Sequence, residues 1–170
     1  MKGVNLICLD IDGVLNNLID SECFNSDKYI NLSKHNIKLL NKIIKETSTD
    51  ENPTKILLSS SWRKYFTGWF GINVFFEAVG INPVCIDKTP ELNEKLRGFE
   101  ILSWLTNVQF IDNRIIKSLC ILDDEDNMDI LKPWQIQTDP RTGLTIKDVN
   151  EAIKMLNKPF DFQINLGINK

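Results

Sequence analysis

Acidic and hydroxyl side chains gather where three apolar runs of this sequence end. The runs around 4–9, 55–59 and 118–122 are followed or closed by Asp10 and Asp12, by Ser59, Ser60 and Ser61, and by Asp123 and Asp124. Carboxylates brought close together repel one another, so such a cluster is costly without a cation. Oxygen ligands with few His or Cys nearby favour magnesium over zinc. A magnesium ion among carboxylates is typical of sites that handle phosphate.

The spacing of Asp10 and Asp12 has a chemical consequence of its own. Two residues apart on a strand, side chains share a face. One carboxylate can attack phosphorus while the other gives and takes a proton, and a covalent aspartyl-phosphate divides the reaction into two easier steps. The leaving oxygen needs a proton in the first step and water needs a base in the second, and Asp12 could serve in both.

The elements that must position these residues alternate along the chain. We expect strands at 4–9, 55–59, 83–86, 118–122 and 134–137, with helices at 36–46, 97–106, 126–131 and 146–156. Largely apolar strands alternating with amphipathic helices predict an open parallel α/β sheet. Ligands of such sheets bind beyond the carboxyl ends of the strands, so the acidic residues and the serines should meet at one edge.

Two segments are less regular. Residues 15–34 predict a loop or small flap, and the aromatic-rich stretch 62–79 predicts two short helices separated at Gly68 and Gly71. Aromatic side chains after the serines could stack on nucleic-acid bases, but core packing is the commoner role, and we expect it for Phe70, Phe75 and Phe76. We expect a single domain over 1–158, followed by a tail over 159–170.

Four segments in order resemble the motifs of the haloacid dehalogenase (HAD) superfamily. They are LDIDGVL, KILLSSS, the RGFEILSWL helix opened by Arg97, and CILDDE, and together they span residues 4 to 125. The segments SSSWR and RGFEILSWL are further similar to small phosphatase domains of RNA-repair type, including polynucleotide 3'-phosphatases. The resemblance implies a three-layer Rossmann-like α/β fold with a central parallel sheet and no large cap domain.

The resemblance also implies roles for individual residues. Asp10 would be the nucleophile and a Mg²⁺ ligand, and Asp12 the acid and base, with its backbone carbonyl on the metal. Asp123 would ligate Mg²⁺ directly, and Asp124 directly or through water. Ser60 would bind a phosphoryl oxygen, with Ser59 and Ser61 as alternatives because a one-residue shift changes which hydroxyl points inward. Arg97 would hold the phosphate, with Lys95 as the competing cation.

The expected function is a magnesium-dependent phosphomonoester hydrolase. Short gaps between the motifs leave no room for a full cap, which by resemblance favours large or open-ended substrates: a nucleotide or a polynucleotide-end phosphate. The alternatives are a metal-dependent nuclease that uses Asp10, Asp123 and Asp124 only as ligands, and a catalytically idle HAD-fold binding domain. The substrate partner is thus a phosphorylated small molecule or a nucleic-acid end, and no obligate protein partner is inferred.

Bulk properties set the remaining bounds. The formal net charge of −3 gives no support for tight, non-specific binding to a polyanion. The cysteines Cys8, Cys23, Cys85 and Cys120 and the single histidine, His35, form no zinc pattern, so free packed thiols are expected. No apolar stretch approaches the ~20 residues that span a bilayer. These features predict a cytoplasmic protein without a membrane segment.

Overall fold

A parallel sheet forms the centre of the chain. The computed structural model describes residues 3–17, 32–92, 96–111 and 115–161. In this part of the chain, the sheet has the strand order β3-β2-β1-β4-β5, and all its neighbours pair in parallel. The strands are β1 Gly3–Leu9, β2 Thr54–Leu58, β3 Cys85–Lys88, β4 Ile115–Asp123 and β5 Gln135–Gln137. The predicted α/β fold with a parallel sheet is confirmed.

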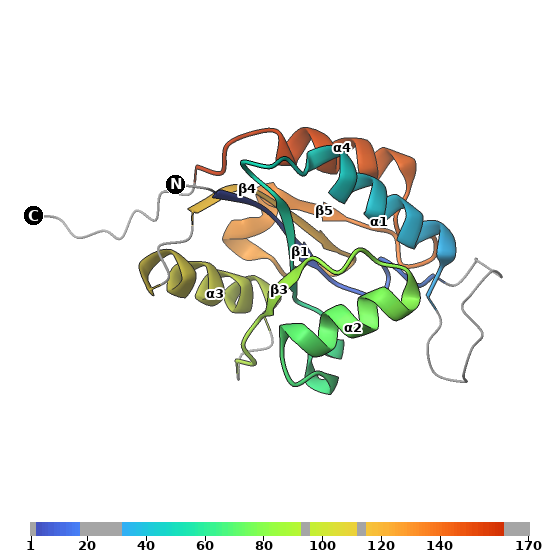
Figure 1. Cartoon of the computed structure of the whole chain (residues 1–170), viewed down its shortest axis with the longest axis horizontal. Coiled ribbons are helices and arrows are strands. Elements are labelled where there is room, and N and C mark those ends of the chain that lie inside the picture. The colour runs from blue at the N-terminus through green and yellow to red at the C-terminus, as the bar shows by residue number, and fades with distance from the viewer. Residues whose placement is uncertain (1–2, 18–31, 93–95, 112–114, 162–170) are drawn as a thin grey trace, which may run out of the picture.

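Helices cover both faces of this sheet (Figure 1). The α-helices are α1 Lys34–Thr47, α2 Trp69–Val79, α3 Arg97–Ile111 and α4 Ile146–Leu156, and the 3₁₀-helices are η1 Ser61–Tyr65 and η2 Asp129–Trp134. Buried side chains of α1, α2 and α4 share one hydrophobic core with the sheet, and those of α3 and η2 share another. Because both faces are buried, β1 has the continuous apolar sequence from which it was predicted.

Side chains alternate between the two faces of the sheet, and this alternation decides on which face the residues at the strand ends project. Cys8 of β1, Leu57 of β2 and Ile121 of β4 all belong to the core beneath α3. Asp10, Ser59 and Asp123 each lie two residues further along. Since side chains two apart in extended chain share a face, these three residues project on the α3 side of the sheet. The order of the strands therefore brings them together at its carboxyl edge.

Helix starts follow their local sequence signals. The hydroxyl of Ser33 accepts a hydrogen bond from the backbone N–H of Asn36 at the start of α1. Thr145 and Asp148 form a capping box at the start of α4, each side chain accepting from the other's backbone N–H. These caps satisfy N–H groups that a helix start leaves without partners.

Some boundaries differ from prediction. β3 begins two residues later than expected, because Val84 N–H turns back to donate to the carbonyl of Asn82 at 2.8 Å. Gly68 precedes α2 as expected, but Gly71 lies inside that helix and does not interrupt it. The helix expected at 126–131 is the 3₁₀-helix η2, over 129–134. Most of the expected flap falls on 18–31, outside the described residues.

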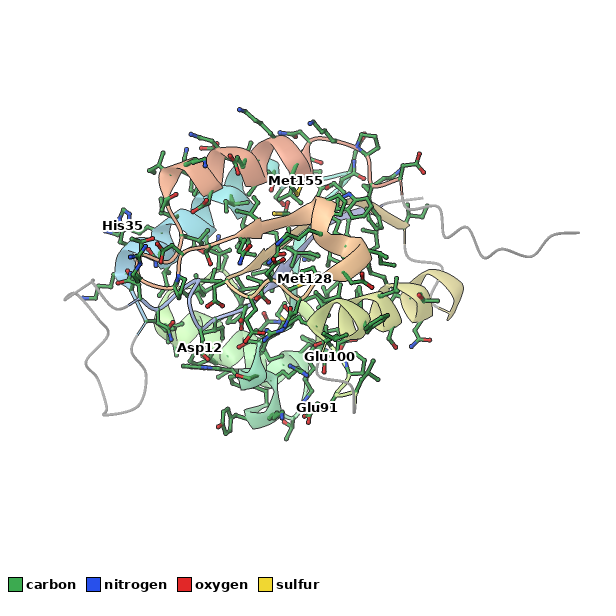
Figure 2. All side chains as sticks on the ribbon, turned by 180° about the vertical axis from the view of Figure 1, so that it is seen from behind. Asp12, His35, Glu91, Glu100, Met128 and Met155 are labelled. Carbon is green, nitrogen blue, oxygen red and sulfur yellow. The ribbon has the colours of Figure 1, made fainter. Side chains whose placement is uncertain are left out.

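In the described part of the chain, the thiols and the histidine lie outside the cluster of acidic residues at the strand ends. Cys8, Cys85 and Cys120 are free and buried, and burial raises the pKa of all three, that of Cys85 to about 12. Cys23 lies outside the described residues. His35 is exposed near the start of α1, away from Asp12 (Figure 2). No helix in the described ranges is both long and apolar enough to span a membrane.

Gly98, in the first turn of α3, allows this helix to approach the backbone of Met128 closely. A Cβ atom at Gly98 would lie 2.4 Å from the carbonyl oxygen of Met128, a backbone atom that cannot rotate away. We expect Gly98→Ala to push the start of α3 from the sheet edge and to lower the free energy of unfolding by about 1–3 kcal/mol, measured by urea denaturation.

Gly71→Ala is the matched control. The nearest atom to a Cβ at Gly71 is 3.9 Å away. In a helix, Gly→Ala is expected to raise the free energy of unfolding by up to about 1 kcal/mol. Equal losses in the two variants would contradict the proposed seating of α3.

Candidate functional site

Three carboxylates converge where β1 and β4 end. The backbone N–H of Asp10 donates to the carbonyl of Leu122 at 2.9 Å, which continues the strand ladder and sets Asp10 beside Asp123. Asp10, Asp123 and Asp124 can each offer one oxygen such that all three oxygens lie within 4.8 Å of one another. Asp10 is 4% exposed and Asp123 is 0% exposed, so two of these groups are removed from water.

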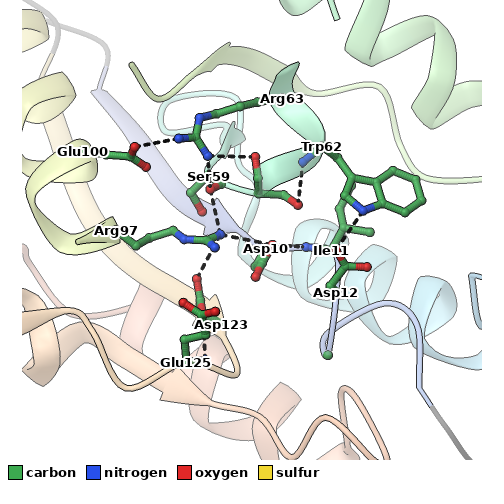
Figure 3. A network of polar contacts seen from close by, with 12 residues as sticks. Asp10, Ile11, Asp12, Ser59, Trp62, Arg63, Arg97, Glu100, Asp123 and Glu125 are labelled. Carbon is green, nitrogen blue, oxygen red and sulfur yellow. Dashed lines mark hydrogen bonds and ion pairs between the residues drawn. The ribbon is translucent and has the colours of Figure 1, made fainter. Parts of the chain in front are cut away.

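Arg97 enters this cluster from the first residue of α3. Its Nη1 atom lies 3.1 Å from Asp10 Oδ1 and 3.4 Å from Asp123 Oδ2, and it donates to the carbonyl of Ser59 at 2.7 Å (Figure 3). Burial lowers the pKa of Arg97, but the charges of Asp10 and Asp123 outweigh it, and the pKa is raised. The guanidinium therefore stays charged. Lys95, the competing cation, lies outside the described residues.

One guanidinium does not neutralise the cluster. Burial, and then the charge of Asp10, raise the pKa of Asp123 to about 7, although Arg97 acts in the opposite direction. Burial and Asp10 also raise the pKa of Asp124. Three ionised carboxylates and one guanidinium have a formal charge of −3 + 1 = −2. The ionised cluster therefore lacks the charge of one divalent cation.

The donor atoms fit magnesium. Oxygen is the only element that these three side chains offer, and hard oxygen donors suit Mg²⁺. Gly13 lets the chain pass close to this cluster: its φ is +69°, and a Cβ there would lie 2.4 Å from Asp124 Cγ. The glycine of the Asp-x-Asp-Gly segment is thus required both by backbone conformation and by the space that Asp124 occupies.

The three serines after β2 have different surroundings. The hydroxyl of Ser60 accepts from the backbone N–H of Trp62 and caps η1, and Ser61 is exposed. Ser59 is fully buried, and within the described ranges its hydroxyl has no hydrogen-bond partner. Because Ser59 shares the face of Asp10, its unpartnered hydroxyl is on the same side of the sheet as the carboxylates.

A buried ion pair holds the serine backbone. Arg63 Nη2 lies 2.7 Å from Glu100 Oε1 on α3, and Arg63 Nη1 donates to the carbonyls of Ser59 and Ser60 at 3.2 and 3.0 Å. Both side chains are less than 10% exposed. The sequence interpretation missed this pair, because an Arg and a Glu 37 residues apart carry no local signal of contact. Its only signal was the position of Arg63 directly after the serines.

Asp12 lies apart from the carboxylate cluster. It is exposed, and its Oδ2 accepts from the indole Nε1–H of Trp62 at 2.9 Å while its Oδ1 accepts from Asn16 Nδ2 at 2.6 Å. The structure thus gives two carboxylates, only two residues apart, different settings (Figure 3). Asp10 is buried against a cation, and Asp12 faces solvent with two neutral donors.

A pocket lies beside Arg97. Its volume is about 280 Å³, and its lining includes Ser61, Lys64, Glu91, Arg97, Glu125 and Asn127. Glu100 also lines the pocket, and it lies on the same side of the molecule as Glu91 (Figure 2). Arg97 is therefore accessible from a solvent-filled space as well as in contact with Asp10.

The comparison with protein families agrees with this geometry. The family described as "HAD domain in Swiss Army Knife RNA repair proteins" matches residues 6–149. The chain belongs to this family. The match includes the ends of β1, β2 and β4 and the start of α3. No curated protein and no solved structure matches the chain significantly.

If the cluster binds Mg²⁺, the metal will stabilise the fold, because binding to the native state alone shifts the unfolding equilibrium. We expect millimolar Mg²⁺ to raise the unfolding midpoint relative to EDTA, measured by differential scanning fluorimetry. Asp124→Asn removes one ligand and part of the negative charge, so it should reduce this rise by half or more.

Asp126→Asn is the control. Asp126 is exposed, pairs with Lys132 and lies two residues from Asp124. The variant should respond to Mg²⁺ as the wild type does. An equal rise in all three proteins would show that the metal acts elsewhere.

Proposed function

We propose that this HAD domain is a magnesium-dependent phosphomonoester hydrolase that forms an aspartyl-phosphate on Asp10. The proposal is carried by the environment of Asp10: a buried carboxylate that contacts Arg97, adjoins two further carboxylates and lies on the same face as the unpartnered hydroxyl of Ser59. A nucleophilic carboxylate beside a cation and a phosphate donor set is what covalent phosphoryl transfer requires.

In the first step, an oxygen of Asp10 attacks phosphorus and the ester bond to the leaving oxygen breaks. Asp12, in its protonated form, gives its proton to that oxygen, which departs as an alcohol. Arg97 and the Ser59 hydroxyl hold the phosphoryl oxygens, and Arg97 also offsets the charge of the attacking carboxylate.

In the second step, a water molecule attacks the phosphorus of the aspartyl-phosphate. Asp12, now ionised, takes a proton from this water, and the acyl-phosphate bond breaks to release inorganic phosphate and restore Asp10. Asp12 is suited to this exchange because it is exposed and lies outside the cluster. Bound Mg²⁺, held by Asp10, Asp123, Asp124 and the Asp12 carbonyl, would supply positive charge that balances the cluster and the phosphoryl group.

For the substrate we propose a nucleotide or polynucleotide-end phosphate. The family description names RNA repair proteins, and large aromatic side chains follow the serines directly. Tyr65 is 84% exposed, Trp69 55% and Phe70 71%, and the rings of Trp69 and Phe70 meet edge-on at 6.2 Å. The expectation that Phe70 belongs to the core is wrong, whereas Phe76 is buried and Phe75 packs against the core. Exposed aromatic rings can stack on bases of any sequence.

The compartment that we propose is the cytoplasm. Cys8, Cys85 and Cys120 are free buried thiols, the state expected in a reducing environment.

Trapping the covalent intermediate tests the chemistry. After acid quench of turnover with Mg²⁺ and a phosphate ester, intact-mass analysis should find a phosphoryl adduct on the protein. Peptide-mass analysis after digestion should place the adduct on the peptide that contains Asp10. Asp10→Asn should abolish the adduct and lower kcat by several orders of magnitude, because the amide is not a nucleophile. Its far-UV circular dichroism should match that of the wild type.

Asp139→Asn is the control, since Asp139 is a surface residue whose partner is Arg141. It should retain both the adduct and turnover. Cleavage of internal phosphodiester bonds without an adduct would support a metal-dependent nuclease instead. Absence of turnover on a panel of nucleoside 3'- and 5'-monophosphates and 3'-phosphorylated oligonucleotides would support an idle binding domain.

The exposed aromatic surface formed by Tyr65, Trp69 and Phe70 predicts that KM depends on whether the substrate carries bases that can stack. Tyr65→Ala together with Trp69→Ala should raise KM about tenfold for a 3'-phosphorylated oligonucleotide, since one stacked base contributes ~1–3 kcal/mol. KM for p-nitrophenyl phosphate should not change. Ile146→Ala, which removes an exposed apolar side chain from α4, is the control. Equal KM values for the oligonucleotide in all variants would contradict base stacking at this surface.

A further inference from the structure

We propose that Trp62 is a positioning residue for the acid/base chemistry of Asp12, through the hydrogen bond from its indole N–H. This inference rests on the proposed function and adds to it a residue of η1, the 3₁₀-helix that follows β2. The donor and acceptor atoms, Trp62 Nε1 and Asp12 Oδ2, are 2.9 Å apart, although the residues are separated by 50 positions in the chain.

An exposed carboxylate without partners would rotate among several orientations. Asp12 has a donor on each oxygen, Trp62 on Oδ2 and Asn16 on Oδ1, and the two together select one orientation. Proton transfer needs the acid within hydrogen-bond reach of the leaving oxygen, so selecting the orientation favours the reaction. Each carboxylate oxygen has two acceptor sites, so these bonds leave room for the transferred proton.

The indole can fix Asp12 because the indole is itself fixed. The backbone N–H of Trp62 donates to the hydroxyl of Ser60, which connects Trp62 to the segment of serines that follows β2. Its ring packs on that of Phe75, with the two ring centroids 5.9 Å apart. Phe75 in turn contacts the fully buried Phe76, with a centroid distance of 6.2 Å. Trp62 thus connects the loop after β2 with the loop after β1 (Figure 3).

The chemistry of the indole separates positioning from the proton transfer itself. Its N–H is a donor only, so Trp62 neither takes a proton from Asp12 nor replaces it. Loss of the N–H should therefore matter most for substrates whose leaving group needs protonation. A leaving group that departs readily as an anion needs no acid and should be affected little.

Two esters of nearly equal size make this test. Phenyl phosphate has a poor leaving group and p-nitrophenyl phosphate a good one. We expect Trp62→Phe, which keeps an aromatic ring and removes the N–H, to lower kcat/KM for phenyl phosphate at least tenfold more than for p-nitrophenyl phosphate. General acid catalysis contributes ~10²–10⁴-fold, which leaves room for this difference. kcat/KM is the quantity to compare because it reports the steps up to ester cleavage.

Two further variants control for packing and for Asp12. Phe75→Leu loosens the ring beneath Trp62 and keeps the N–H, so the difference that it produces between the esters should be smaller than that of Trp62→Phe. In an Asp12→Asn background, Trp62→Phe should produce no additional difference between the esters. Equal losses for both esters in Trp62→Phe, or a difference that persists without Asp12, would overturn the inference.

A measurement independent of turnover examines the contact itself. The indole N–H resonance of Trp62, assigned by its loss in Trp62→Phe, should shift in Asp12→Ala but not in Asp126→Asn. An unchanged resonance in Asp12→Ala would also overturn the inference. If the wild type hydrolyses neither ester while this resonance shifts, the proposed function fails and the contact is structural only.

Discussion

Arg97 places one positive charge between two carboxylates that the fold has removed from water. Asp10 and Asp123 end adjacent parallel strands, so their proximity is a direct consequence of the β1–β4 register. Without a cation between them, burial and mutual repulsion would both oppose ionisation. The guanidinium lies 3.1 and 3.4 Å from the two carboxylates and lowers the pKa of Asp123, but burial outweighs it and raises that pKa to about 7. A further cation at these carboxylates would relieve this imbalance.

The position of Arg97 depends in turn on close backbone contacts. Gly98 lets the first turn of α3 approach the carbonyl of Met128, and Gly13 lets the β1 loop approach Asp124. The same end of α3 presents Glu100 to Arg63, which holds the carbonyls of Ser59 and Ser60. Arg97 donates to the Ser59 carbonyl as well. Two guanidinium groups, from α3 and η1, thus hold the carbonyls of Ser59 and Ser60, and the Ser59 hydroxyl takes no part in these bonds.

The sequence was sufficient for the parts of the site that lie at strand ends. Asp10 and Asp123 were predicted to meet because apolar runs are local signals and parallel topology brings strand ends together, whereas Arg97 was predicted from the resemblance to the HAD motifs. Contacts that depend on tertiary packing could not be predicted in this way. The Arg63–Glu100 pair and the Trp62–Asp12 bond join residues 37 and 50 positions apart. Phe70 was assigned to the core because aromatic residues are usually buried, but on α2 it faces outward.

Asp10 and Asp12 show how one short segment supplies two kinds of carboxylate. Asp10 is the last group held by the ladder, through its N–H bond to Leu122, and so shares the buried, cation-paired environment of the sheet edge. Two residues later the chain has left the sheet, and the described side chains that donate to Asp12, Trp62 and Asn16, are neutral. A nucleophile must keep its negative charge, whereas an acid and base must exchange protons with water. In the proposed mechanism, the end of β1 divides these requirements between the two residues, and the hydrogen bond from Trp62 orients Asp12, which lies outside the sheet.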